Sequence, residues 1–401
     1  MKGSWWTTIE QMDADQRAFV RLGADGRHLL VGPPGCGKTN LLVMRARYIY
    51  GLGLKNVLFL TFTRALADFI RAGVASKKGL LEPEQVQTFN YWAFKHIATY
   101  APEQISKIDR SAPFETSRQQ VMAALAVANT RIEGVNLYDA VLIDEVQDLH
   151  IDEIGALMRM SERITVAGDV KQMVFESGGS IGKLEALGFH KTELRFHYRI
   201  GTAIANVADK ALQPVDPANR LRANCNYLED EQQSRARLTE FTTRDEQFSA
   251  MYKSIARQLR TYPNEGIGVI VPRNFLLLEL KAKFAAEDPL PGGVAFHDET
   301  NEEHSFSSGK NVHVISLKSS KGAEFRAVHL YGLEELKYPQ VRRELVFTAV
   351  TRAKTSLDGY YTGKVLNSIA SAFAEAPVTP LSEPPRLSWR PVGLSQAAVA
   401  A

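Results

Sequence analysis

The stretch Gly-Pro-Pro-Gly-Cys-Gly-Lys-Thr, residues 32–39, decides the fold of this chain. A short apolar run, residues 28–31, precedes it, and apolar residues at helical spacing follow over residues 40–50. A strand, a glycine-rich turn and a helix in this order match the pattern GxxxxGK[ST], in which backbone amides surround phosphate oxygens. A chance glycine-rich turn is the weaker interpretation, because both flanking elements are present. The sequence therefore predicts a nucleoside triphosphate site at this turn.

The chemistry of such a loop assigns a role to each polar residue in it. The ammonium of Lys38 is expected at the β- and γ-phosphates, and the hydroxyl of Thr39 on Mg²⁺. The candidate ATP-binding residues here are Gly32, Pro33, Gly35, Cys36, Gly37, Lys38, Thr39 and Asn40.

A second apolar run, residues 140–143, ends at Asp144 and Glu145. One carboxylate at such a strand end can hold Mg²⁺, and the next can take a proton from the attacking water. An exposed acidic turn is the alternative, and it is the weaker one beside a phosphate-binding loop. We therefore expect Asp144 and Glu145 in the same site as Lys38, with ATP and Mg²⁺ as cofactors.

Composition excludes several classes of protein. The chain has 401 residues, 45% hydrophobic and 23% charged, which is ordinary for globular protein and too long for one compact core. No run approaches the roughly 20 apolar residues that a membrane span needs, and no signal-peptide region is visible, so we expect a cytoplasmic protein. Cys36 and Cys225 are too few for a disulfide framework or a cysteine-rich metal site. A net charge of +3 permits nucleic-acid binding without arguing for it.

Strand and helix patterns alternate along the chain, which predicts an α/β fold with parallel sheets. The expected strands are residues 28–31, 57–61, 140–143 and 164–167, and then 192–196, 268–271, 312–316 and 328–331. We expect a first domain over residues 1–179 with a small helical insertion at about 101–136, and a second domain over residues 180–373. Residues 374–401 contain many prolines and are expected to form a poorly packed tail.

Nine short segments in a fixed order carry a family resemblance. They are Asp15-Gln16-Arg17, residues 32–39, Thr61-Phe62-Thr63, Thr88-Phe89-Asn90, residues 144–148 (DEVQD), residues 168–172 (GDVKQ), Tyr198-Arg199, residues 317–325 (LKSSKGAEF) and Val350-Thr351-Arg352-Ala353. One such segment is suggestive, and nine in order leave little room for coincidence. Over about residues 13–354 the chain resembles the UvrD/Rep/PcrA family of superfamily 1A DNA helicases. It resembles a short form, because the large helical insertions of typical relatives do not fit in its length.

The resemblance implies an ATP site shared between two RecA-like P-loop domains. On the base side, Gln16 would read the adenine edge, Tyr198 would stack on the adenine ring, and Glu324 would contact the ribose. Domain closure on ATP then becomes necessary for hydrolysis.

On the phosphate side, the resemblance makes Asp144 the Mg²⁺ ligand and Glu145 the general base. Gln172 would sense the γ-phosphate. Arg199 and Arg352 would be the arginine fingers contributed by the second domain. The resemblance selects these two, because composition alone does not distinguish them from the other arginines.

The resemblance also implies a strand-binding set in which hydroxyls and amides hold phosphates while aromatic faces stack bases. Its members are Phe62, Thr63, Arg64, Thr88, Asn90, Phe175 and Lys318. Three of them depart from the family pattern. Arg64 replaces an asparagine, Asn90 and Lys318 each replace a histidine, and Phe175 remains as the stacking residue where a tryptophan is missing.

These residues predict an ATP-dependent translocase and helicase on single-stranded DNA, with 3′ to 5′ stepping as in the family. An alternative is a nucleic-acid-stimulated ATPase switch that controls a partner protein, for example a nuclease in DNA repair or phage defence. An RNA substrate also stays open, because contacts to phosphates and base faces do not distinguish sugars.

Overall fold

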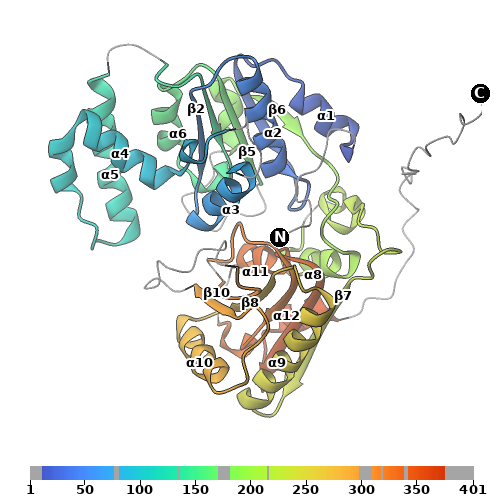
Figure 1. Ribbon diagram of the computed structural model, residues 1–401. Coiled ribbons are helices and arrows are strands. Elements are labelled where there is room, and N and C mark those ends of the chain that lie inside the picture. Colours follow the sequence, from blue (N-terminus) through green and yellow to red (C-terminus); the bar gives the residue numbers. More distant parts are fainter. Residues whose placement is uncertain are drawn as a thin grey trace, which may run out of the picture.

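The computed structural model describes residues 11–75, 81–132, 136–169, 181–214, 216–297, 309–317, 319–337 and 342–374. It contains two six-stranded sheets, each covered by helices, and every pairing between named strands is parallel (Figure 1). Parallel neighbours joined through helices are the arrangement that alternating strand and helix patterns require. The chain therefore has the predicted α/β fold with two RecA-like domains.

The first sheet has the strand order β3-β2-β4-β5-β1-β6. Its strands are β1 (Arg27–Val31), β2 (Val57–Thr61), β3 (Val86–Thr88), β4 (Ala140–Ile143), β5 (Ile164–Gly168) and β6 (His190–Glu193). The helices of this domain are α1 (Ala14–Val20), α2 (Lys38–Gly51), α3 (Arg64–Ala75), α4 (Phe89–Tyr100), α5 (Phe114–Thr130), α6 (Ile151–Met158) and α7 (Ile181–Leu184). Strands β2, β4 and β5 are buried along their whole length, because helices cover both faces.

The last strand of this sheet corrects the expected division of the chain. The sequence suggested a second domain from residue 180 and a strand of that domain at 192–196, but β6 pairs with β1, with Val31 opposite Glu193. The sheet of the first domain therefore extends to Glu193. β6 is an edge strand with mostly exposed side chains, so its residues carry no burial pattern that would assign it to either sheet.

The second sheet has the order β7-β12-β11-β8-β10-β9. Its strands are β7 (Arg235–Phe241), β8 (Ile267–Val271), β9 (Val294–His297), β10 (Val312–Ser316), β11 (Phe325–Leu330) and β12 (Ala353–Thr362). Its helices are α8 (Thr202–Leu212), α9 (Arg244–Thr261), α10 (Asn274–Ala285), α11 (Arg343–Val350) and α12 (Asn367–Phe373). The proline-rich segment expected as a tail lies beyond Ala374, outside the described residues.

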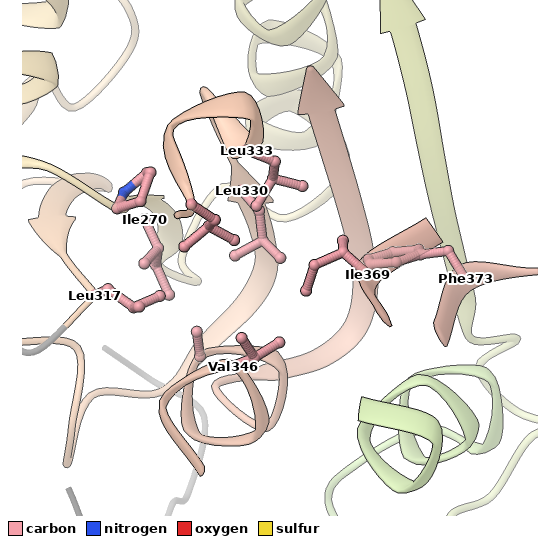
Figure 2. Close-up of a pocket in the computed structure, with 10 residues that line it drawn as sticks. Ile270, Leu317, Leu330, Leu333, Val346, Ile369 and Phe373 are labelled. Atoms are coloured by element: carbon pink, nitrogen blue, oxygen red, sulfur yellow. The ribbon is translucent and has the colours of Figure 1, made fainter. Parts of the chain in front are cut away.

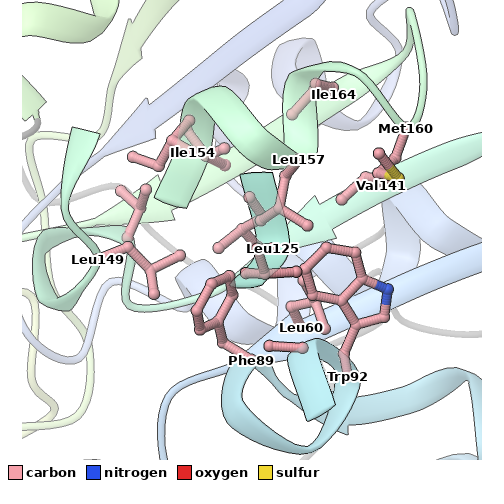
Figure 3. Close-up of a cluster of buried hydrophobic side chains, with 14 of the residues drawn as sticks. Leu60, Phe89, Trp92, Leu125, Val141, Leu149, Ile154, Leu157, Met160 and Ile164 are labelled. Atoms are coloured by element: carbon pink, nitrogen blue, oxygen red, sulfur yellow. The ribbon is translucent and has the colours of Figure 1, made fainter. Parts of the chain in front are cut away.

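Helix α5, which lies in the expected insertion, and α4, which precedes it, are built into the core of the first domain. Figure 3 shows Phe89 and Trp92 of α4 and Leu125 of α5 packed against Leu60 of β2 and against residues of α6. Burying large aromatic and aliphatic side chains in this way is the main source of stability for such a contact. Helices α4 and α5 are therefore held in a fixed position relative to the sheet.

The second domain has a separate apolar core. Figure 2 shows one pocket within it, where Ile270, Leu317 and Leu330 face Val346 of α11 and Ile369 of α12. Its lining residues are all apolar, so this pocket offers no polar group for phosphate or metal chemistry. In the part of the chain that the structure describes, no helix is long and apolar enough to cross a membrane.

Candidate nucleotide site and nucleic-acid interface

The phosphate-binding loop lies between β1 and α2, as its pattern predicts. Gly35 and Gly37 have φ angles of +80° and +90°, in the left-handed region that favours glycine. A Cβ atom at Gly35 would also lie 3.2 Å from Cβ of Arg199, which reaches the loop from the segment after β6. Because α2 begins at Lys38, its amino-terminal N–H groups face the loop and favour an anion there.

The ammonium of Lys38 is held inside the loop by carbonyl oxygens. Its Nζ donates to the carbonyl oxygen of Gly32 at 2.8 Å and to that of Pro33 at 3.0 Å. Asn40, two residues further along α2, is buried. A phosphate entering the loop would therefore meet a cation that is already in place.

Thr39 and Asp144 meet across the first domain, although 105 residues separate them in the chain. The Thr39 hydroxyl donates to Oδ2 of Asp144 at 2.6 Å, and burial together with the charge of Glu145 raises the pKa of Asp144. A hydroxyl and a carboxylate suit Mg²⁺, which takes few protein ligands and keeps waters and phosphate oxygens. Thr39 and Asp144 are thus the residues that would hold the ion. Across the described ranges, no cluster of three or more His, Cys, Asp or Glu side chains could hold another metal.

Glu145 is fixed in place by a glutamine that the sequence reasoning did not assign. The backbone of Glu145 is in the left-handed region, with φ of 54°, which is strained for a non-glycine residue and often marks a functional position. The amide of Gln147 donates to the Glu145 carboxylate, and Oε1 of Gln147 accepts from the N–H of Asp169 at 3.0 Å. Gln147 therefore joins the end of β4 to the end of β5.

The charge state of Glu145 suits a general base. Burial opposes ionisation, but the cations of Lys321, Lys38 and Arg352 outweigh it and lower the pKa of Glu145 overall. A buried carboxylate that stays ionised can accept a proton from water. Lys321 and Arg352 belong to the second domain, so the state of Glu145 depends on both domains.

The predicted adenine residues lie on the other side of the loop. Nε2 of Gln16 donates to the carbonyl oxygen of Cys36 at 2.9 Å, and Asp13 caps α1 by accepting from the N–H of Gln16 at 2.8 Å. The hydroxyl of Tyr198 donates to the carboxylate of Asp13. The backbone N–H of Tyr198 donates to the carbonyl oxygen of Gly35 at 3.2 Å. Gln16 and Tyr198 are thus brought together, while their contact with adenine stays a prediction.

The predicted arginine fingers lie side by side. Arg199 forms an ion pair with Glu324, the residue predicted to contact ribose. Arg352 is buried and donates to the carbonyl oxygens of Thr348 at 2.9 Å and of Ala323 at 3.3 Å. Burial, reinforced by the charge of Arg352, lowers the pKa of Arg199 to about 9. Gln172, predicted to sense the γ-phosphate, lies outside the described residues.

The predicted strand-binding residues gather at the carboxyl ends of two neighbouring strands. Thr61 of β2 pairs with Thr88 of β3, so Phe62 and Thr63 follow one strand end while Asn90 follows the other. The side-chain hydroxyls of Thr63 and Thr88 also cap helices. Thr63 Oγ1 accepts a hydrogen bond from the N–H of Leu66 at 3.3 Å, and Thr88 Oγ1 accepts one from the N–H of Tyr91 at 3.2 Å. Arg64 and Asn90 are exposed on this edge. Phe175 and Lys318 lie outside the described residues.

Two residues of the insertion join this edge, and sequence reasoning missed both. The guanidinium of Arg118 lies 5.9 Å from the ring centroid of Phe62 and 5.8 Å from that of Phe114. Phe114 is 55% exposed, which is unusual for a phenylalanine and leaves its ring accessible. No motif contains Phe114 or Arg118, so only the packing of α5 against the sheet could reveal them.

Two family models match the chain. Residues 16–177 match the model described as an AAA domain, and residues 311–357 match the UvrD-like helicase C-terminal domain. Together with the phosphate-binding loop and the paired sheets, these matches define a P-loop protein of the helicase class. Within that class, the two matches support the resemblance to UvrD/Rep-like superfamily 1 helicases.

Among solved structures, the chain is similar to one titled "The structure of PRRSV helicase". The sequence identity is 16% and the TM-score is 0.42, over 86% of this chain and 54% of that chain. The present chain thus spans about half the length of that structure. No curated protein matches the sequence.

Proposed function

We propose that this chain is an ATP-dependent translocase that moves 3′ to 5′ along single-stranded DNA and unwinds duplex DNA. One observation carries the proposal: Lys321 of the second domain places its Nζ 4.0 Å from Oε2 of Glu145, which ends β4 of the first domain. A hydrolytic site that needs both domains responds to their relative movement, and such movement is what a motor on a strand uses. The direction and the DNA substrate follow from kinship with UvrD/Rep-like helicases.

Each residue of the site has a defined task in this proposal. Thr39 and Asp144 would hold Mg²⁺, which supplies charge neutralisation on the phosphates when it is bound. Lys38 would exchange its contacts with two loop carbonyls for phosphate oxygens. The Glu145 carboxylate would accept the proton of the attacking water. Arg352 would stabilise the negative charge that develops on the γ-phosphate.

The test is ATP turnover of the purified protein with and without single-stranded DNA, run beside strand displacement on duplexes with a 3′ or a 5′ overhang. We expect DNA to raise kcat about tenfold or more, equivalent to about 1.4 kcal/mol of activation free energy. Displacement is expected for the 3′ overhang. Stimulation without displacement would favour an ATPase switch that serves a partner such as a nuclease, and stimulation by RNA alone would reassign the substrate.

Phe62→Ala tests the strand interface. Stacking of one base on an aromatic ring contributes about 1–3 kcal/mol, so the Kd for a labelled oligonucleotide should rise about tenfold or more in a fluorescence anisotropy titration. Phe275→Ala is the matched control, because Phe275 is a half-exposed phenylalanine on α10 of the second domain. Equal oligonucleotide affinities for the wild type and both variants would show that Phe62 does not belong to the strand interface. Melting temperatures are compared as well, since Phe62 also packs against the core of the first domain.

A further inference from the structure

A buried lysine crosses from the second domain into the first. Lys321 lies between β10 and β11, and its Nζ is 2.6 Å from Oδ1 of Asp148 and 4.0 Å from Oε2 of Glu145. The side chains of Lys321 and Asp148 are 3% and 1% exposed. A cation of one domain is therefore enclosed between two carboxylates of the other.

Burial makes this arrangement geometrically demanding. Charges removed from water are tolerated only when they are paired at close range, so each partner restricts where the other can lie. Among the described residues, Oδ2 of Asp148 is buried and has no hydrogen-bond partner. The position of the Asp148 carboxylate consequently depends on Lys321.

The turn that carries Asp148 is held from the strand-binding side by Arg118. Nη2 of Arg118 donates to the carbonyl oxygen of Asp148 at 2.8 Å, and Nε donates to Oε1 of Glu153 at 2.7 Å. The same guanidinium lies over the ring of Phe62. Arg118 therefore connects the ring of Phe62 to the backbone of Asp148.

The loop that carries Lys321 also touches the strand-binding edge. Gly322 has a φ of +80°, and a Cβ atom at this position would lie 3.4 Å from Oγ1 of Thr63. Lys321, which contacts Asp148 and Glu145, is thus next in the chain to a glycine that lies close to Thr63.

We propose that Lys321 and Asp148 form a clasp between the domains that positions Glu145 and couples strand binding at Phe62 and Thr63 to ATP hydrolysis. The inference rests on the proposed ATPase function and names the residues that would carry its coupling. Lys321 and Asp148 act through Glu145, so both are positioning residues. Spatial contact alone does not establish coupling, which has to be measured as non-additivity.

The experiment is a double-mutant cycle in the full chain with Lys321→Met, Asp148→Asn and the double variant. Each single change should lower DNA-stimulated kcat about tenfold or more, with the KM for ATP within about threefold of wild type. The ratio of stimulated to basal turnover should fall toward one. The double variant should lose no more than the worse single variant, because the pair acts as a unit. Lys321→Arg, which keeps the charge, should restore part of the stimulation.

Lys283→Met is the matched control, because Lys283 forms an exposed pair with Asp245 within the second domain. The clasp would be overturned if the fold losses in kcat of the two single variants multiply in the double variant. It would also be overturned if the ratio of stimulated to basal turnover stays at the wild-type value. Lys321 and Asp148 would then form only a stabilising ion pair. If Lys321→Met does not fold, the isosteric Asp148→Asn variant decides by the same ratio. Absence of turnover in the wild-type protein would refute the proposed function instead, so the two failures are distinguishable.

Discussion

Replacing Lys38 with alanine is expected to lower ATP turnover by about 10²-fold or more, both with and without nucleic acid. Burial alone would lower the pKa of Lys38, but the carboxyl groups of Asp169, Glu145 and Asp144 oppose this effect and the pKa is raised overall, so the side chain remains an ammonium. The substitution removes the ammonium that the loop carbonyls of Gly32 and Pro33 hold in place. A coupled spectrophotometric assay of ADP release measures the loss.

Lys55→Ala serves as the control for this change, because Lys55 is an exposed lysine in the loop before β2. Its turnover should match that of the wild type. Wild-type turnover in the Lys38→Ala protein would refute the assignment of the nucleotide site.

Glu145→Gln is expected to lower kcat by about 10²- to 10⁴-fold, the usual contribution of a general base. Glutamine has nearly the same shape, so the contact with Gln147 can persist, but its amide cannot accept the proton of the attacking water. ATP binding should survive, and a titration with a fluorescent ATP analogue should give a Kd close to that of the wild type. The protein would then bind ATP without turning it over, which separates this variant from Lys38→Ala.

Glu162→Gln is a suitable control, because Glu162 is an exposed glutamate in the segment just before β5 and is not one of the residues of the nucleotide site. Single-turnover hydrolysis in the Glu145→Gln protein at the wild-type rate would show that another group acts as the base.

Several strands in which apolar residues predominate could be predicted from the sequence, whereas β12, which contains more polar residues, could not. The predicted bounds of β2, β4 and β10 agree with the structure. Strand β12 escaped prediction because Ser356 and Asp358 interrupt its apolar pattern. Both are bonded to Arg235 on the adjacent strand β7, with Ser356 Oγ 2.8 Å from Nε and Asp358 Oδ2 3.2 Å from Nη2. That compensation exists only once the sheet has formed.

The candidate site divides in a similar way. Lys38, Thr39, Asp144 and Glu145 could be chosen because phosphate and metal chemistry demand these residue types at a strand end or in a glycine-rich turn. The pairing of Lys321 with Asp148 joins positions 173 residues apart, and nothing in either local sequence indicates it. Such contacts depend on how two domains approach each other, which periodicity and composition do not encode.

The burial of Cys36 allows the opening of the phosphate-binding loop to be followed by the chemical labelling of a native cysteine. Its side chain is 1% exposed within the phosphate-binding loop, and burial raises the pKa of its thiol, so the reactive thiolate is scarce. The other cysteine, Cys225, is partly accessible and serves as an internal reference. An alkylating reagent can reach Cys36 only when the loop opens, so its labelling rate relative to Cys225 would time that opening without any introduced dye.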